Sequence, residues 1–86
     1  MRINVLTEII KQKISHSVTV KSIEIQDKTF LHKKHKNYRE GKYHLKIIIN
    51  SEELKKKGRI NANRTIFTIL KYEIDNFIHS LQISLT

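Results

Sequence analysis

The residues best suited to chemistry in this chain are its histidines, since the sequence contains five of them and no cysteine. His79 stands between the main expected helix and the last expected strand, whereas His32 and His35 lie in a basic segment far upstream. Histidine is the commonest metal ligand, and its charge changes near neutral pH. Without a thiolate, the chain cannot form a disulfide, a cysteine zinc site or a cysteine-ligated cluster by itself. Any chemistry with soft metals must therefore use imidazole, and a partner must supply any sulfur.

The other polar residues do not indicate an enzyme. The sequence has no Ser/His/Asp set, no glycine-rich phosphate loop and no pair of inward-facing carboxylates. Ser80 follows His79 directly, but neighbouring residues of a strand point to opposite faces, which is the wrong geometry for a nucleophile and its base. His44 is expected on the outer face of a strand, as a surface residue or as a hydrogen-bond partner across the sheet. We therefore expect a binding protein.

Positive charge is concentrated in two segments of the chain. The net charge is +9. Residues 28–46 hold seven Lys or Arg and one acid, and residues 55–64 hold five Lys or Arg and no acid. Such a surface field favours a polyanionic partner, although solubility and a lysine-rich composition explain it equally well.

The 86 residues are expected to form a single domain, residues 1–86, with a modest core. The N-terminus lacks the apolar run of a signal peptide, and no stretch approaches the roughly 20 apolar residues that span a bilayer. We expect a cytoplasmic protein that makes no membrane contact and is monomeric when free.

Apolar residues at three- and four-residue spacing predict three helices. The first covers residues 3–15. A short second helix over residues 52–57 follows a capping Ser51 and ends at a glycine. The main helix begins after Asn61 or Asn63, and its apolar stripe consists of Ile66, Ile69, Leu70, Ile74 and Phe77.

Alternating apolar and polar residues predict three strands. The first contains two apolar pairs that differ in phase, so a bulge is expected between them, near residues 21–22: Val18 and Val20, then Ile23 and Ile25. A charged loop over residues 27–40 leads to the second strand, residues 43–50. The third strand presents one inward face made of His79, Leu81, Ile83 and Leu85.

The element order α-β-β-α-α-β predicts an α+β fold of two layers, in which helices cover one face of a three-stranded sheet. The outward-facing residues are Glu24, Gln26, His44, Lys46, Ser80 and Gln82. This order also resembles the class II KH fold, which holds nucleic-acid backbone with a Gly-x-x-Gly loop between two helices. Here that connection, residues 55–59, is basic but contains a single glycine, Gly58.

Four short motifs in this order resemble the BolA family over roughly residues 14–86. Residues 23–35 are similar to the family's first strand and its Ser-x-x-His-x-Gly-His loop. Residues 43–51 resemble its Ser/Thr-His-Phe strand, which ends in Ser. Residues 60–66 are similar to its Arg-His-Arg helix start, and residues 73–81 to its Glu-Leu and Val-His-Ala-Leu ending.

The chain departs from this pattern at three places. Asn63 stands where the Arg-His-Arg motif has its histidine, and Lys34 stands where the loop has its glycine. The usual Phe-x-Gly before the main helix reads Leu-Lys-Lys, with Gly58 two places late. His79 and the loop histidines keep their places.

The resemblance implies an iron–sulfur cluster partner of a monothiol glutaredoxin. In such complexes a bridging 2Fe–2S cluster takes thiolates from the glutaredoxin and glutathione, and the BolA-like protein contributes its terminal histidine and a loop His or Cys. Here those ligands are His79 and either His32 or His35. The Thr-x-x-His spacing after the first strand favours His32, whereas counting back from the second strand favours His35. Alone, the chain is expected to hold no cluster.

A second interpretation is a DNA-binding transcriptional regulator, which is the role of some members of the BolA family. The basic residues of the helix–turn–helix region are suited to phosphate contacts: Lys55, Lys56, Lys57, Arg59 and Arg64. No aromatic stacking platform accompanies them, so nonspecific binding is favoured over sequence-specific binding.

Overall fold

The first helix buries the apolar stripe that its sequence predicts. A computed structural model describes residues 1–29 and 42–86 and places α1 at Ile3–Ser17. Leu6, Ile10 and Ile14 follow one another at four-residue spacing and are fully buried. These three side chains hold α1 against the sheet and belong to the main core cluster.

Three strands form one sheet in the order β1-β2-β3: β1 is Ser22–Asp27, β2 is Tyr43–Asn50 and β3 is Ile78–Leu85. β1 pairs antiparallel with β2, and β3 pairs parallel with β2. β2 is the central strand, and its Leu45, Ile47 and Ile49 are buried on the face that meets the helices.

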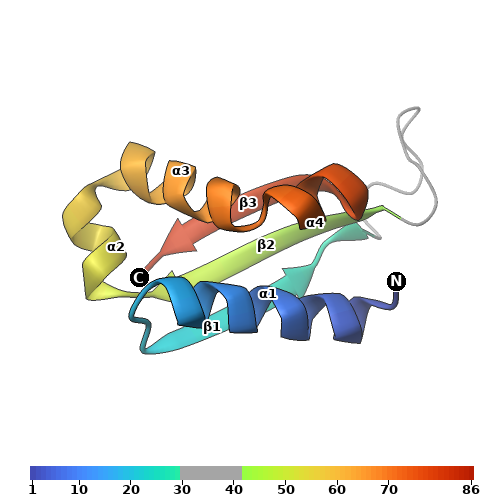
Figure 1. Ribbon diagram of the computed structural model, residues 1–86, viewed down its shortest axis with the longest axis horizontal. Coiled ribbons are helices and arrows are strands. Elements are labelled where there is room, and N and C mark those ends of the chain that lie inside the picture. The colour runs from blue at the N-terminus through green and yellow to red at the C-terminus, as the bar shows by residue number, and fades with distance from the viewer. Residues whose placement is uncertain (30–41) are drawn as a thin grey trace.

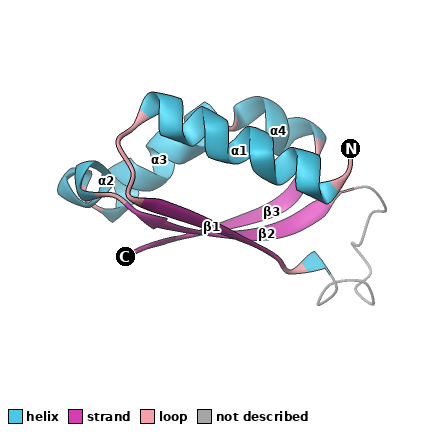
Figure 2. Ribbon diagram, turned by 90° about the horizontal axis from the view of Figure 1, so that it is seen from below, coloured by secondary structure: helices cyan, strands magenta, loops and turns pink. Residues whose placement is uncertain are grey.

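The connection from β2 to β3 contains the other helices, α2 at Glu52–Lys57, α3 at Arg59–Ile69 and α4 at Lys71–Asn76. Ser51 caps α2, because its side chain accepts a hydrogen bond from the Leu54 N–H. Figure 2 shows α1, α3 and α4 together on one face of the sheet, and none of the helices α1 to α4 covers the other face. The predicted α+β fold, with helices on a single face, is confirmed.

The main helix begins earlier than expected. Gly58, whose φ is +84°, separates α2 from α3, so α3 starts at Arg59 and neither Asn61 nor Asn63 is its cap. A positive φ is a conformation that glycine adopts without the steric cost of a Cβ atom. The main helix then breaks at Leu70, which is fully buried between α3 and α4.

The expected bulged first strand is wrong at its beginning. Val18 caps the C-terminal end of α1, where its N–H donates to the Ile14 carbonyl. In Figure 1 the blue helix α1 leads from this end into β1. Pairing with β2 starts only where the Lys21 N–H donates to the Asn50 carbonyl at 2.7 Å. Val18 and Val20 differ in phase from Ile23 and Ile25 because they lie in the connection between α1 and β1 and not in one bulged strand.

An ion pair between a half-exposed lysine and a buried carboxylate joins α1 to α4. Lys13 Nζ lies 2.7 Å from Glu73 Oε2, and the Glu73 side chain is 4% exposed whereas that of Lys13 is 41% exposed. Glu73 Oε1 has no hydrogen-bond partner within the described part of the chain. The carboxylate therefore depends on Lys13 for its charge compensation, whereas the ammonium also reaches water.

Across residues 1–29 and 42–86, no helix is both long and apolar enough to cross a membrane.

The two halves of this ion pair should contribute unequally to stability. Lys13→Met leaves the Glu73 carboxylate buried without its cation, and we expect it to lower the free energy of unfolding by about 3 kcal/mol. Glu73→Gln removes the buried charge and leaves a lysine that can be hydrated, so we expect a loss of only about 1 kcal/mol. Urea denaturation measures both changes.

Lys11→Met is the matched control, since Lys11 lies on the same helix and is exposed. Its effect should stay below about 0.5 kcal/mol. Equal losses in the free energy of unfolding for Lys13→Met and Glu73→Gln would contradict the conclusion that the buried Glu73 carboxylate depends on Lys13.

Candidate metal-ligand site

A register shift at the start of β3 determines where His79 lies. Tyr43 is paired with Ile78, but the next residue of β2, His44, is paired with Ser80. His79 is therefore an extra residue in β3, as in a β-bulge, which re-aims a side chain and bends its strand. Ile78 is buried in the core, and alternation towards the core resumes at Leu81.

The expected inward orientation of His79 is wrong for this reason. His79 is exposed, and its ring stacks on the ring of His44, with 4.7 Å between centroids and 28° between planes. Without the extra residue, alternation along β3 would place His79 on the core side with Leu81. Its exposure agrees with the accessibility that a metal ligand requires.

His44 is held by contacts from two directions. Its Nδ1 lies 2.7 Å from Ser80 Oγ on β3, and its backbone N–H donates to Thr29 Oγ1 at 3.1 Å. The hydrogen bond across the sheet confirms one of the two expectations for His44. The other is wrong, because His44 is 6% exposed and therefore not a surface residue.

Neighbouring side chains of a regular strand point to opposite faces of the sheet, but those of His79 and Ser80 lie on the same face. Both contact the same imidazole, Ser80 by the hydrogen bond at Nδ1 and His79 by stacking. The serine therefore orients His44, and His44 supports the ring of His79. Neither role was deduced from the sequence, because each depends on which residues of β2 and β3 are paired.

No group of three or more His, Cys, Asp or Glu that could bind a metal occurs in residues 1–29 and 42–86. An exposed imidazole at His79 fits the supply of one ligand to a metal whose other ligands come from elsewhere. His32 and His35 lie outside the described residues.

Thr29 is held close to this site. Its Oγ1 accepts a hydrogen bond from the His44 N–H, and Lys42 lies two residues before His44 in the sequence. Asp27 fixes Thr29 by accepting hydrogen bonds from its N–H, at 3.0 Å, and from its hydroxyl.

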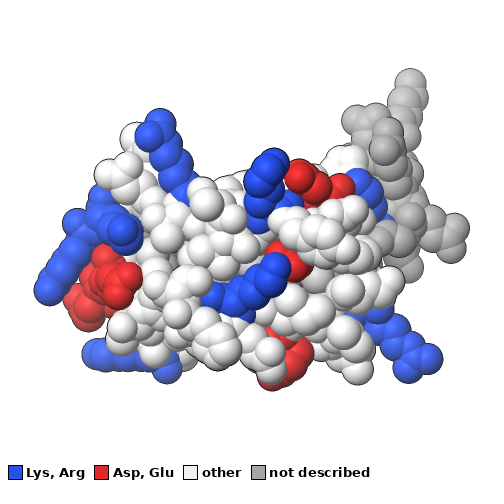
Figure 3. All heavy atoms as spheres, viewed as in Figure 1, with Lys and Arg blue, Asp and Glu red and all other residues white. Residues whose placement is uncertain are grey.

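The basic residues expected to contact phosphate lie at the opposite end of β3. All five are exposed: Lys55, Lys56, Lys57, Arg59 and Arg64. Figure 3 shows blue side chains gathered at the end of the molecule where Figure 1 places α2, with red acidic side chains beside them. Glu52 Oε1 of α2 lies 3.5 Å from Lys55 Nζ, so the local positive field is weaker than the run of lysines alone indicates.

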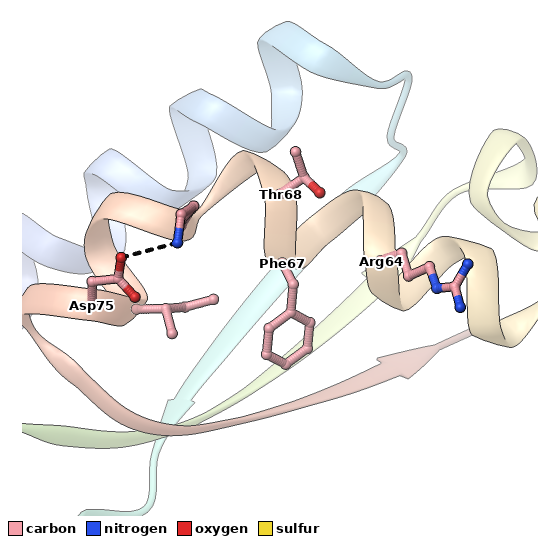
Figure 4. Close-up of a pocket in the computed structure, with 6 residues that line it drawn as sticks. Arg64, Phe67, Thr68 and Asp75 are labelled. Atoms are coloured by element: carbon pink, nitrogen blue, oxygen red, sulfur yellow. Dashed lines mark hydrogen bonds and ion pairs between the residues drawn. The ribbon is translucent and has the colours of Figure 1, made fainter.

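An apolar hollow beside Arg64 was not anticipated. Figure 4 shows Phe67 pointing away from α3 between Arg64 and Asp75, and Phe67 is 41% exposed. Lys71 and Asp75 form an ion pair of 3.3 Å at one end of the hollow. The sequence offered a signal, since Phe67 falls outside the apolar stripe of the main helix.

Comparisons with known proteins agree on one family. The model of the BolA-like protein family matches residues 6–86. A protein of Buchnera aphidicola subsp. Acyrthosiphon pisum (strain APS), with the name Uncharacterized protein BU473, is 35% identical over 77 residues, or 90% of this chain and 71% of that protein.

Solved structures share the fold. The BolA domain of SufE1 from Arabidopsis thaliana superposes with a TM-score of 0.76 at 22% identity, covering 92% of this chain and 87% of that chain. BolA1 from Arabidopsis thaliana gives a TM-score of 0.75 at 18% identity, covering 91% and 86%. The resemblance noted in the sequence motifs is thus confirmed at the level of family and fold.

Proposed function

The chain belongs to the BolA-like protein family, and from this premise we propose that it is a partner of a monothiol glutaredoxin in handling iron–sulfur clusters. Its cargo would be a 2Fe–2S cluster shared with the glutaredoxin and glutathione. The observation that carries the proposal is the exposed His79, which the bulge in β3 turns out of the core. The chain acts by binding and performs no catalysis of its own.

The metal ligands that this chain can offer suit a cluster shared with a partner and not a cluster bound by the chain alone. The sequence has no cysteine, so every thiolate must come from the partner and glutathione. His79 supplies a nitrogen ligand from an exposed position on β3. Replacement of thiolate by imidazole raises the potential of a 2Fe–2S centre, and imidazole ligation fails when the ring is protonated.

The supporting residues of His79 keep its ring in place without ligating. His44 lies against one face of the ring, and Ser80 fixes His44 through Nδ1. An outer layer of hydrogen bonds of this kind orients metal ligands in many proteins. The second nitrogen ligand of the proposal is His32 or His35. The Thr-x-x-His spacing after the first strand favours His32.

The setting proposed for this partnership is a reducing compartment, the cytoplasm. Thiolates of the glutaredoxin and glutathione ligate only in their reduced form, which such a compartment maintains.

Replacing His79 should separate cluster binding from folding. We expect His79→Ala to fold, because the side chain is exposed, and to lose the mixed cluster when iron, sulfide, glutathione and a monothiol glutaredoxin are supplied. The readout is the charge-transfer absorption of the heterocomplex after gel filtration, and circular dichroism checks the fold.

The matched control is His16→Ala, since His16 is exposed at the end of α1 and remote in sequence from the site. This variant should retain the cluster fully, and His32→Ala should lose less than His79→Ala if His35 substitutes. A wild-type level of mixed cluster in His79→Ala would contradict the proposal.

DNA binding by the basic residues around Gly58 is the second candidate function. It is favoured by one specific observation: the exposed lysines of α2 and Arg59 of α3 lie together on either side of a turn with a positive φ. Such a cluster suits phosphate contacts, which give affinity without sequence specificity. Regulation of transcription would then need a further source of specificity.

Salt dependence tests this candidate. Combined replacement of Lys55, Lys56, Lys57 and Arg59 by Gln should weaken binding to all duplex sequences alike, and each lost phosphate contact should flatten the salt slope by about 0.9. Fluorescence anisotropy at several salt concentrations measures the slope.

Replacement of the exposed Arg2 and Lys11 by Gln provides the control, and this variant should leave the slope unchanged. A change in sequence preference at constant slope would indicate base readout by the segment and contradict the electrostatic account.

A further inference from the structure

The outer edge of β3 carries backbone groups that no strand uses. In the described part of the chain β3 pairs only with β2, so its other side is an open edge. The Thr86 N–H donates to the Ile49 carbonyl of β2 at 2.9 Å. Because backbone groups alternate in direction along a strand, the N–H and C=O of Ser84 also face β2. Those of Ile83 and Leu85 therefore face the open edge.

These two residues line a groove with a basic wall. The groove has a volume of about 300 Å³, and its other lining residues are Lys55, Arg59, Asn63, Gln82 and Ser84. In Figure 1, α3 runs along β3 on the side of this edge, and α2 closes the end of the molecule where β3 terminates. Arg59 is exposed and forms no ion pair within residues 1–29 and 42–86, so its charge is available to a ligand.

We propose that this groove binds an extended acidic segment of a partner protein, which adds to the sheet as a fourth strand beside β3. A peptide in extended form repeats N–H and C=O groups that match the free groups of Ile83 and Leu85. Acidic side chains of the segment would pair with Arg59 and Lys55.

The same geometry disfavours a phosphate backbone along this strand edge. A phosphate backbone has no N–H donors, so it would leave the outward carbonyls of Ile83 and Leu85 unpaired, and their negative ends would face its charge. An unpaired buried backbone group costs free energy comparable to a lost hydrogen bond. The basic residues of the turn can contact phosphate outside the groove, but the edge itself matches a polypeptide.

The groove is separate from the metal-ligand site. Ser84 lies five residues beyond His79 on β3, which corresponds to roughly 16 Å at the rise of an extended strand. Ile83 and Leu85 therefore lie at a different place along β3 from His79. The inference goes beyond the proposed cluster function and does not depend on it.

The test uses the full chain and a short peptide of alternating valine and glutamate with blocked ends. We expect its titration to shift the backbone amide signals of Ile83, Leu85 and Arg59 in nitrogen–proton correlation spectra, and to slow hydrogen exchange of the Ile83 and Leu85 amides. Replacing glutamate by lysine in the peptide, or N-methylating its alternate residues, should abolish both effects.

Arg59→Glu should weaken binding of the peptide roughly tenfold at low salt. This factor corresponds to about 1.4 kcal/mol of binding free energy, the combined effect of removing an attraction and adding a repulsion. Arg2→Glu is a close control, since Arg2 is also an exposed arginine beginning a helix, and it should change the affinity by less than about twofold.

Three results would overturn the proposal: no binding of the peptide, equal binding of the N-methylated peptide, or amide shifts confined to residues outside the groove. An oligothymidylate that shifts the Ile83 and Leu85 amides while the peptide does not would assign the groove to nucleic acid.

Discussion

The parallel pairing of β3 with β2 is the constraint on which the rest of this structure depends. Parallel neighbours cannot be joined by a hairpin, so the chain must cross over one face of the sheet before β3 begins. The crossover consists of α2, α3 and α4, and together with α1 it covers the apolar face of β2. It also places the basic turn around Gly58 at one end of β3 and His79 at the other.

A single extra residue at the start of β3 converts this scaffold into a candidate ligand site. Ile78 faces the core before it and Leu81 packs against the core after it, so the two residues between them, His79 and Ser80, both turn outward. His79 stacks on His44, whose position is fixed by Ser80 and Thr29. The site therefore combines an accessible imidazole with a rigid support, which suits a ligand shared with a partner.

Local patterns were sufficient to predict α1, β2, α2 and the one-sided sheet, because each carries its own signal: a four-residue apolar spacing, strict alternation, or a capping serine. The face of His79 was not predictable, since the bulge arises from the pairing of β2 with β3 and no residue type marks it. The burial of His44 likewise depends on Thr29 and Ser80, which are distant in sequence. Val18 is apolar, which fits a strand and the end of a helix equally well, so its place at the end of α1 was not predictable from the local pattern.

The most direct test of the central claim is pulsed electron paramagnetic resonance on the reduced heterocomplex, with nitrogen-15 histidine in this chain only and an unlabelled glutaredoxin. Nitrogen bound to a paramagnetic cluster gives a strong hyperfine coupling whose pattern depends on the isotope. The account predicts that labelling changes this pattern from nitrogen-14 to nitrogen-15, and that the change is kept in His16→Ala. A cluster without strong nitrogen coupling, or with a coupling that labelling leaves unchanged, would contradict ligation by this chain.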